Sequence, residues 1–198
     1  HDPRILDMAK AVMGPDLILL FTHLFCKPAE SGRVVPWHQD GPFWPVVPMK
    51  SCTIWLALDD VDRGNGAMKV IPGSHKKPAI EHSLTDDPSS TLNRELPVKD
   101  VDVAKAKLIE LKAGQISLHD IGIIHGSAAN SSGRRRAGLA LRYMPASSCM
   151  HRVMPNAAAS WEDMPMELVL GENRNERNDF SLGDFGRPWS QAGLDQHG

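Results

Sequence analysis

The chain has 198 residues and a mass of 21.7 kDa, close to the usual size of one compact domain. Hydrophobic residues make up 41% and charged residues 23%, which is ordinary globular usage and disfavours a disordered, collagenous or disulfide-scaffold protein. The formal net charge of -2 supplies no broad basic surface, so we expect a partner that is neither nucleic acid nor membrane.

Cysteine usage and hydropathy point to a cytoplasmic location. The three cysteines are scattered and form no Cys-x-x-Cys pair, which favours a reducing compartment. The most apolar run, residues 17–25, is far shorter than the roughly 18 to 20 residues of a spanning helix. The chain starts at His1 without a leader, and we expect that an N-terminal part is absent. Composition alone leaves the oligomeric state unknown.

Periodicity predicts one helix followed by many strands. Asp2 and Pro3 are typical of a helix start, and apolar residues recur at helical spacing up to Gly14. Beyond Pro15, strand-like runs bounded by Gly, Pro and Asp occupy residues 17–25, 34–40, 51–58, 67–71, 115–119, 123–127 and 137–143. Asn65-Gly66 and Pro72-Gly73 are turn signals. This pattern predicts a mainly β fold, either a sandwich or a barrel.

Two regions fall outside the strand pattern. Residues 80–107 are polar and irregular, as expected for a surface lid or a tolerated insertion. The tail, about residues 150–198, contains three prolines and a polar run, and we expect it to wrap around the barrel. We therefore predict a single domain over residues 1–198, with its barrel core at about residues 16–145.

A His-x-Asp motif is the sharpest chemical signal. His38 and Asp40 stand two residues apart in a predicted strand, so their side chains would share one face. Two histidines and one carboxylate form the open non-haem Fe(II) site, which requires a third ligand. His125 is preferred over His119 for that position, because an arginine, Arg136, follows it by eleven residues. A lone His-x-Asp is more often a turn or a hydrogen-bonded pair.

Arg136 stands at the head of the last predicted strand. A guanidinium fixed there could hold the distal carboxylate of a 2-oxo acid in a bidentate contact. Its alternative is a solvated basic turn, since residues 134–136 are consecutive arginines of which at most one or two can face inward. Lys27, Arg142 and Arg152 could meet an anionic substrate, although exposed basic residues are commonly just solvated.

Five segments together carry a family resemblance: WHQDG at 37–41, TIWLALDD at 53–60, NGAM at 65–68, IPGSH at 71–75 and HGSAANSS at 125–132. From about residue 16 to 143 the chain resembles the phytanoyl-CoA dioxygenase family of Fe(II)/2-oxoglutarate-dependent oxygenases. The resemblance implies a double-stranded β-helix, a jelly-roll barrel, with iron held by His38, Asp40 and His125.

The resemblance also implies contacts to 2-oxoglutarate. Arg136 matches the residue that binds the distal carboxylate, and Ser127 matches a hydroxyl that assists it. The other positions that it places along the co-substrate or substrate cavity are His23, Gln39, Thr53 and Trp55. Core packing is the alternative for Gln39, Thr53 and Trp55, and for Thr53 the two interpretations weigh equally. His23 is not itself a residue of the family motif.

The implied activity is that of a dioxygenase that hydroxylates a small organic substrate. Fe(II), 2-oxoglutarate and O2 would be required, and 2-oxoglutarate would be decarboxylated oxidatively to succinate and CO2. Retention of Asp40 disfavours halogenation, whereas desaturation and cyclisation stay open. A non-catalytic jelly-roll binding module is the rival from another class, and a zinc hydrolase would leave Arg136 without a role. The aromatic pair Phe43-Trp44, flanked by prolines, suits a pocket wall.

Overall fold

The computed structural model describes residues 1–30, 33–152, 161 and 164–180. The chain begins with α1 (Pro3–Met13), whose first turn is capped by the Asp2 carboxylate, which accepts a hydrogen bond from the Arg4 backbone N–H at 2.9 Å. The helix ends at Gly14, whose φ of +97° lies in the region that favours glycine. The predicted helix is confirmed.

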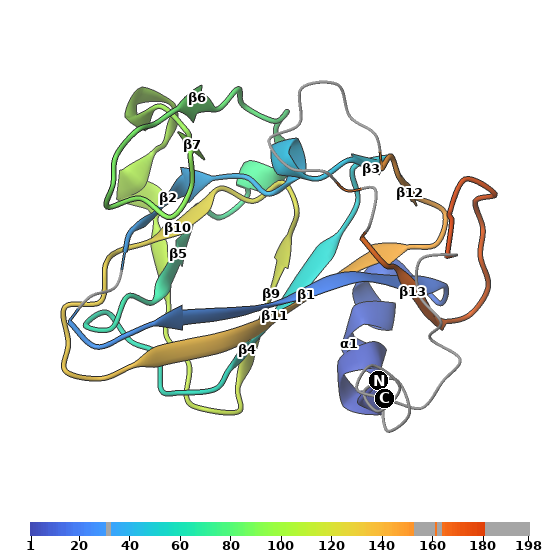
Figure 1. The fold of residues 1–198 in the computed structure, drawn as a ribbon, viewed down its shortest axis with the longest axis horizontal. Coiled ribbons are helices and arrows are strands. Elements are labelled where there is room, and N and C mark those ends of the chain that lie inside the picture. Colours follow the sequence, from blue (N-terminus) through green and yellow to red (C-terminus); the bar gives the residue numbers. More distant parts are fainter. Residues whose placement is uncertain (31–32, 153–160, 162–163, 181–198) are drawn as a thin grey trace, which may run out of the picture.

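Two antiparallel sheets follow, and they face each other in Figure 1. The larger sheet has the order β13 (Glu167–Leu170), β1 (Leu17–Lys27), β11 (Arg136–Pro145), β4 (Cys52–Ala57), β9 (Ile116–Asp120). The smaller sheet has the order β2 (Val35–His38), β10 (His125–Ser127), β5 (Met68–Val70), β8 (Lys107–Ile109). Two further two-stranded sheets pair β3 (Val46–Val47) with β12 (Cys149–Met150) and β6 (Ser83–Leu84) with β7 (Arg94–Glu95).

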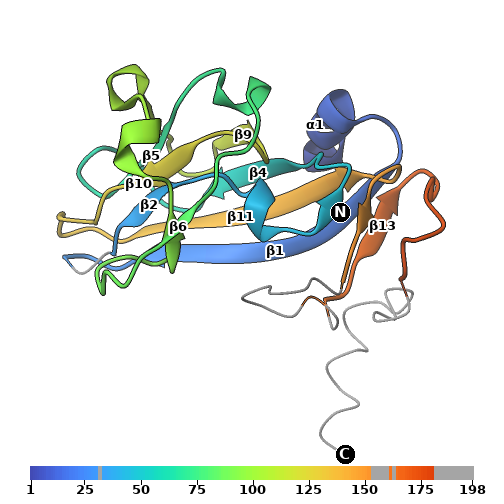
Figure 2. The same ribbon diagram turned by 90° about the horizontal axis from the view of Figure 1, so that it is seen from above.

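Neighbouring strands in each sheet come from distant parts of the chain, as in a double-stranded β-helix. All seven predicted strands are present, each within two residues of its expected ends. The predicted mainly β, jelly-roll fold is therefore confirmed. Figure 2 shows α1 beside the larger sheet and away from the smaller one.

Strand β11 separates two packing layers because its side chains alternate between the faces of the sheet. Leu141 and Tyr143 face outward and pack with Ala9 of α1. The opposite face carries Ala140, which packs with Trp55 inside the barrel.

A bulge in β1 reverses which of its residues face inward. Leu19 pairs with Tyr143 but Phe21 pairs with Arg142, so the register shifts at Leu20. Leu20 itself belongs to the buried cluster with Trp44. Beyond the bulge, odd-numbered residues such as Phe21 and Lys27 lie on the inward face of the sheet.

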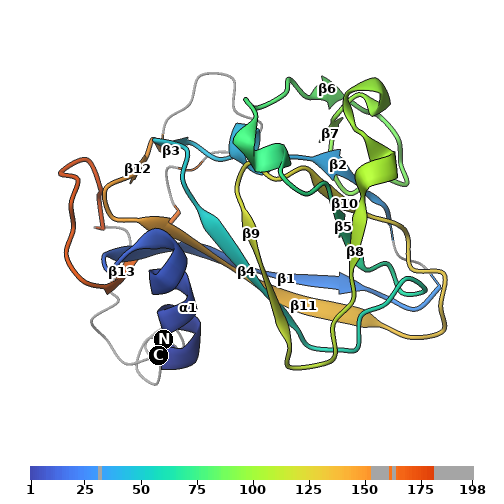
Figure 3. The ribbon, with the colours of Figure 1, turned by 180° about the vertical axis from the view of Figure 1, so that it is seen from behind.

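The region at residues 80–107 lies over β2 (Figures 1 and 3). It contains β6, β7 and the 3-10 turns Val98–Asp100 and Val103–Lys105. Its residues Leu96 and Val101 are buried with Ile124 of the barrel. The region is thus packed against the barrel, while its role as a lid stays a prediction.

The tail contributes β13, which pairs with the start of β1. Residues 181–198 lie outside the described residues, so the predicted wrapping by the tail and the single-domain boundaries stay predictions. Among the described helices, none combines the length and apolar character needed to cross a membrane.

Two leucines on β1 test the packing. Leu20 is 0% exposed and Leu24 is 62% exposed. Leu20→Ala should lower the free energy of unfolding by about 2 to 5 kcal/mol, because it leaves a cavity in the core. Leu24→Ala, the matched control, should change it by less than about 0.5 kcal/mol. Chemical denaturation of both variants measures the difference, and equal effects would contradict the packing.

Candidate metal centre and co-substrate site

Three side chains converge between the sheets. The ligand atoms of His38, Asp40 and His125 all lie within 4.8 Å of one another, and all three residues are buried. His38 and His125 are direct cross-strand partners in β2 and β10, and their ring centroids are 4.1 Å apart. Antiparallel pairing therefore brings two residues far apart in sequence to one point.

Hydrogen bonds orient both imidazole rings. Nδ1 of His38 donates to the carbonyl of Pro36 at 2.8 Å, and Nδ1 of His125 donates to that of Ile123 at 3.0 Å. Because a carbonyl can only accept, these contacts fix the tautomer and leave the Nε2 lone pairs free for a metal. Nε2 of His38 lies 3.5 Å from Oδ1 of Asp40.

Asp40 reaches the centre by a route other than the predicted one. Strand β2 ends at His38, and Asp40 has φ -68° and ψ -35° as the residue before the 3-10 turn Gly41–Phe43. The two residues therefore do not share one strand face, and the predicted reason for their approach is wrong. The turn nevertheless returns the carboxylate to the imidazoles.

Burial controls the protonation of the centre. It lowers the pKa of His125 to about 3, an effect to which His38 adds, so the imidazole is neutral at ordinary pH. Burial alone would raise the pKa of the Asp40 carboxyl, but His125, His38 and Arg142 outweigh it and hold that pKa well below its usual range. Neutral imidazoles and an ionised carboxylate are the states that bind a divalent metal.

His119, the competing histidine, lies next to this centre. Its Nε2 is 3.9 Å from Oδ2 of Asp40, and its ring centroid is 5.0 Å from that of His125. Burial lowers its pKa to about 4. His119 is thus placed to contact Asp40, whereas His125 belongs to the trio that converges.

Arg136 lies inside the barrel and is 5% exposed. Its Nη2 donates to the Gly66 carbonyl at 2.6 Å and to Oγ of Ser127 at 3.4 Å, and its guanidinium stacks 5.4 Å from the Trp55 ring. Its Nε is buried without a hydrogen-bond partner among the described residues. Arg136 and Ser127 therefore lie together inside the barrel, and their binding of a carboxylate stays a prediction.

The other two of the three consecutive arginines face outward. This agrees with the expectation that at most one or two of them can face inward. Arg134 pairs with Asp62, and Arg135 pairs with Asp59 through two oxygens at 2.8 and 2.9 Å.

Lys27 is a functional candidate that sequence reasoning weighed only as a substrate contact. It is the cross-strand partner of Arg136 and is 5% exposed. Its Nζ donates to the carbonyls of Ala128 at 2.5 Å and Ser127 at 3.4 Å. Burial lowers the pKa of Lys27 to about 7, and the nearby Arg136 adds to this. Only the strand register, which the sequence does not show, reveals this pair of cations.

Glycine at position 138 makes room for Trp55. A Cβ atom on Gly138 would lie 2.0 Å from the indole ring, so any larger residue would displace the ring from Arg136. Thr53, two residues before Trp55, is buried and its Oγ1 has no partner among the described residues.

Gln39 and His23 occupy different settings. The Gln39 amide is committed to the backbone, donating to the Gly122 carbonyl at 2.7 Å and accepting from Ile80 N–H at 2.8 Å. His23 is exposed and lies on the inward side of β1, with its ring 4.4 Å from that of Phe25. Co-substrate contacts by either residue stay predictions.

The residues expected at the substrate side also have places. The Phe43 ring lies edge-on at 6.2 Å from His38, and Trp44 is buried in the core cluster. Arg152 donates to the backbone carbonyls of Trp161, Met164 and Asp179. Arg142 is buried inside the barrel rather than solvated.

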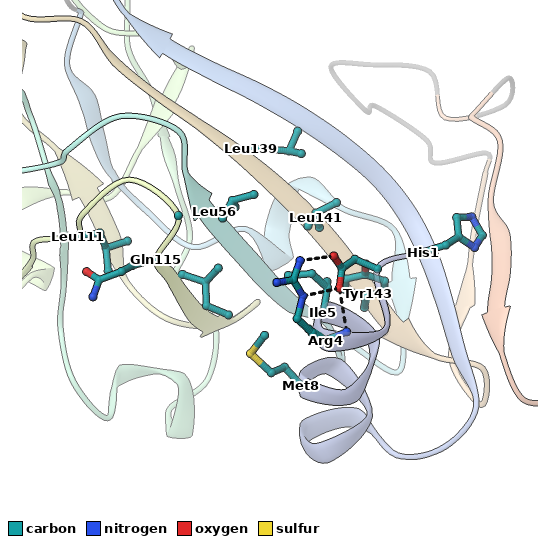
Figure 4. A pocket seen from close by; sticks show the side chains of 13 residues that line it. His1, Arg4, Ile5, Met8, Leu56, Leu111, Gln115, Leu139, Leu141 and Tyr143 are labelled. Atoms are coloured by element: carbon teal, nitrogen blue, oxygen red, sulfur yellow. Dashed lines mark hydrogen bonds and ion pairs between the residues drawn. The ribbon is translucent and has the colours of Figure 1, made fainter. Parts of the chain in front are cut away.

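A cavity of about 710 Å³ lies elsewhere, between α1 and the outer face of the larger sheet (Figure 4). Ile5 and Met8 of α1 and Leu139, Leu141 and Tyr143 of β11 line it. These β11 residues alternate with Arg136, so this cavity and the metal centre lie on opposite faces of the sheet.

Comparison with known proteins agrees with this geometry. Residues 1–138 match the family model described as Phytanoyl-CoA dioxygenase (PhyH). Peroxisomal phytanoyl-CoA dioxygenase of Bos taurus is 32% identical over 142 residues, which are 68% of this chain and 42% of the relative. A probable alpha-ketoglutarate-dependent hypophosphite dioxygenase of Stutzerimonas stutzeri is 31% identical over 145 residues, 72% of this chain and 50% of the relative.

A solved structure extends the match in three dimensions. The apo form of the non-heme monooxygenase ThoJ superposes with a TM-score of 0.69 and 31% identity, covering 87% of this chain and 60% of that one. The chain spans about half or less of the length of the two curated relatives. With its family model matched over residues 1–138, the chain belongs to the phytanoyl-CoA dioxygenase family, whose enzymes use Fe(II), 2-oxoglutarate and O2.

Proposed function

We propose that this chain carries the active site of a Fe(II)- and 2-oxoglutarate-dependent dioxygenase that hydroxylates a small organic substrate. The observation that carries the proposal is the convergence of His38, Asp40 and His125 in the same barrel as a buried, incompletely bonded Arg136. Two imidazoles and one carboxylate fit Fe(II) and leave coordination positions open.

Each group would have a separate task. His38, Asp40 and His125 would hold the metal, and Arg136 with Ser127 would hold the distal carboxylate of 2-oxoglutarate against the Trp55 ring. Bound Fe(II) would supply the site for O2 chemistry, in which one oxygen atom enters the substrate and the other enters succinate as CO2 leaves.

The fixed positions of these side chains matter for the reaction. Backbone carbonyls orient both imidazoles, and Gly138 leaves the space that Trp55 needs beside Arg136. Such prior orientation lowers the cost of arranging reactants around the metal.

A non-catalytic binding module would not require this combination of groups. The convergence of two imidazoles and one buried carboxylate on a single point is an arrangement that binds a divalent metal, which favours the oxygenase. Desaturation and cyclisation would use the same centre, and the product distinguishes them. We also propose that the protein is cytoplasmic and that its activity involves neither nucleic acid nor a membrane.

The direct test is anaerobic addition of Fe(II) and 2-oxoglutarate to the folded protein. We expect the weak visible charge-transfer band of the metal chelate, and Asp40→Ala should abolish both the band and succinate formation. Metal-loaded, folded protein that shows no band would contradict the proposal. With a candidate substrate, gain of one oxygen atom indicates hydroxylation, and loss of two hydrogen atoms indicates desaturation.

The choice between His125 and His119 is testable by metal binding alone. Loss of a group that only supports a ligand typically weakens metal binding by roughly 10- to 100-fold. His119→Ala should stay within that range, while His125→Ala should exceed it, because it removes a ligand. Calorimetric titration with Mn(II) measures both, and a larger effect of His119→Ala would overturn the assignment.

The lowered pKa of Lys27 predicts that 2-oxoglutarate binding depends on pH. With its pKa near 7 in the ligand-free protein, Lys27 is largely neutral above that pH. A bound carboxylate would raise this pKa again, so binding should take up a proton. The affinity should therefore fall as the pH rises above about 7, by at most about tenfold per pH unit.

Calorimetry in two buffers of different ionisation enthalpy detects that proton uptake. Lys27→Met should remove both the uptake and the pH dependence. Uptake that persists in Lys27→Met would assign the proton to another group.

A further inference from the structure

A second arginine points into the barrel. Arg142 follows Arg136 by six residues on β11 and is likewise 5% exposed. Strand alternation places both on the inward face, since the residues between them that face outward, Leu139 and Leu141, line the cavity beside α1. The two guanidinium groups thus enter the same barrel from one strand.

Aromatic rings surround the Arg142 guanidinium. Its Cζ lies 4.8 Å from the Phe21 ring centroid, 4.9 Å from that of Trp44 and 5.6 Å from that of Phe25. Such contacts favour a cation but offer no hydrogen-bond acceptor in the ring plane. The cage also keeps water from the cation, so a charged partner there would be weakly screened.

Arg142 lacks the partners that exposed arginines of this chain have. Arg135 and Arg174 bind aspartates on the surface. Arg142 forms no ion pair with any residue that the structure describes, and its Nε and Nη1 are buried without hydrogen bonds. A buried guanidinium with unused donors is costly unless an acceptor arrives.

Register places these donors near the metal centre. Arg142 pairs with Thr53 on β4, and Thr53 pairs with His119 on β9, which forms one row across the inward face. At the end of the row, His119 contacts Asp40 at 3.9 Å. Oγ1 of Thr53 and Nδ1 of His119 also lack partners within the described part of the chain. Arg136, in contrast, lies at the other end of β11 beside Ser127.

We propose that Arg142, together with Thr53, forms a second oxyanion subsite at the metal end of the barrel interior, opposite the Arg136 subsite. Its occupant is a carboxylate or a similar oxyanion. That group comes either from the metal-binding end of a 2-oxo acid or from an anionic substituent of the organic substrate. The proposal rests on the proposed function, because it takes the barrel interior as the place where the 2-oxo acid binds.

The charges around Arg142 leave room for such an anion. Asp40 raises the pKa of the Arg142 guanidinium, while burial, the larger effect, lowers it. As a metal ligand Asp40 would direct its charge to the metal, so Arg142 would have no dedicated anion. The planar fork of donors on a guanidinium suits a carboxylate or a phosphonate.

The test compares two 2-oxo acids by calorimetric titration of the Mn(II)-loaded chain. 2-Oxoglutarate has both carboxylates, whereas 2-oxopentanoate lacks the distal one. The variants are Arg142→Met, Arg136→Met and, as a matched surface control, Arg135→Met. Acetate and methylphosphonate are then titrated into protein saturated with 2-oxoglutarate.

Two results would support the subsite and identify its source. Weakening of both 2-oxo acids in Arg142→Met by roughly 10- to 100-fold, the size of a hydrogen bond to a charged group, assigns it to the metal-end carboxylate. Arg136→Met should then weaken only 2-oxoglutarate. If Arg142→Met binds both 2-oxo acids as the wild type does but loses acetate or methylphosphonate binding, the subsite is assigned to the organic substrate. Arg135→Met should match the wild type throughout.

Wild-type binding of every probe by Arg142→Met would overturn the proposal and leave Arg142 as a structural cation. If Arg142→Met does not fold, Arg142→Lys keeps the charge in the cage without the planar fork. Weaker binding by Arg142→Lys then supports the subsite, and unchanged binding overturns it. Failure of the wild type to bind 2-oxoglutarate would instead contradict the proposed function.

Discussion

Strand β11 pairs with β1 on one side and β4 on the other, and the register of these two ladders decides which side chains enter the barrel. A shift by one residue would turn Arg136 toward α1 and place Tyr143 inside. The outward cluster around Ala9 and Ile54 prevents that shift, because it would lose its buried contacts. Hydrophobic packing on the outer face of the sheet therefore holds in position the charged groups on its inner face, inside the barrel.

The interior of the barrel carries more positive than negative charge. Arg136 and Arg142 are buried cations, Lys27 is a third when it is protonated, and Asp40 is the buried carboxylate that faces them within the described residues. The charge of a divalent metal and the charge of a doubly ionised 2-oxo acid would cancel each other. After the metal and the 2-oxo acid have bound, the interior would still carry an excess of positive charge. The buried charges would therefore favour an anionic ligand.

Strand-like runs bounded by Gly, Pro and Asp were sufficient to predict the strands, and the His-x-Asp spacing was sufficient to predict that His38 and Asp40 meet. The reason differed, because Asp40 lies in a turn beyond the strand end. Inward positions on β1 could not be predicted, since the bulge at Leu20 reverses the alternation without a sequence signal. The burial of Arg142 was equally hidden, because only the register and three aromatic rings from other segments create its setting. Local pattern determines elements, whereas long-range pairing determines the site.

The direct pairing of His38 with His125 joins β2 to β10 at a position where the register is irregular. A metal bound there would connect two strands that are separated by most of the barrel sequence, and it would bind the folded chain only. The free energy of unfolding should then depend on free metal concentration, rising by about 1.4 kcal/mol for each tenfold increase above the dissociation constant. The catalytic ion would thereby also act as a crosslink of the smaller sheet, and the concentration of free metal around the protein would influence how long the folded protein persists.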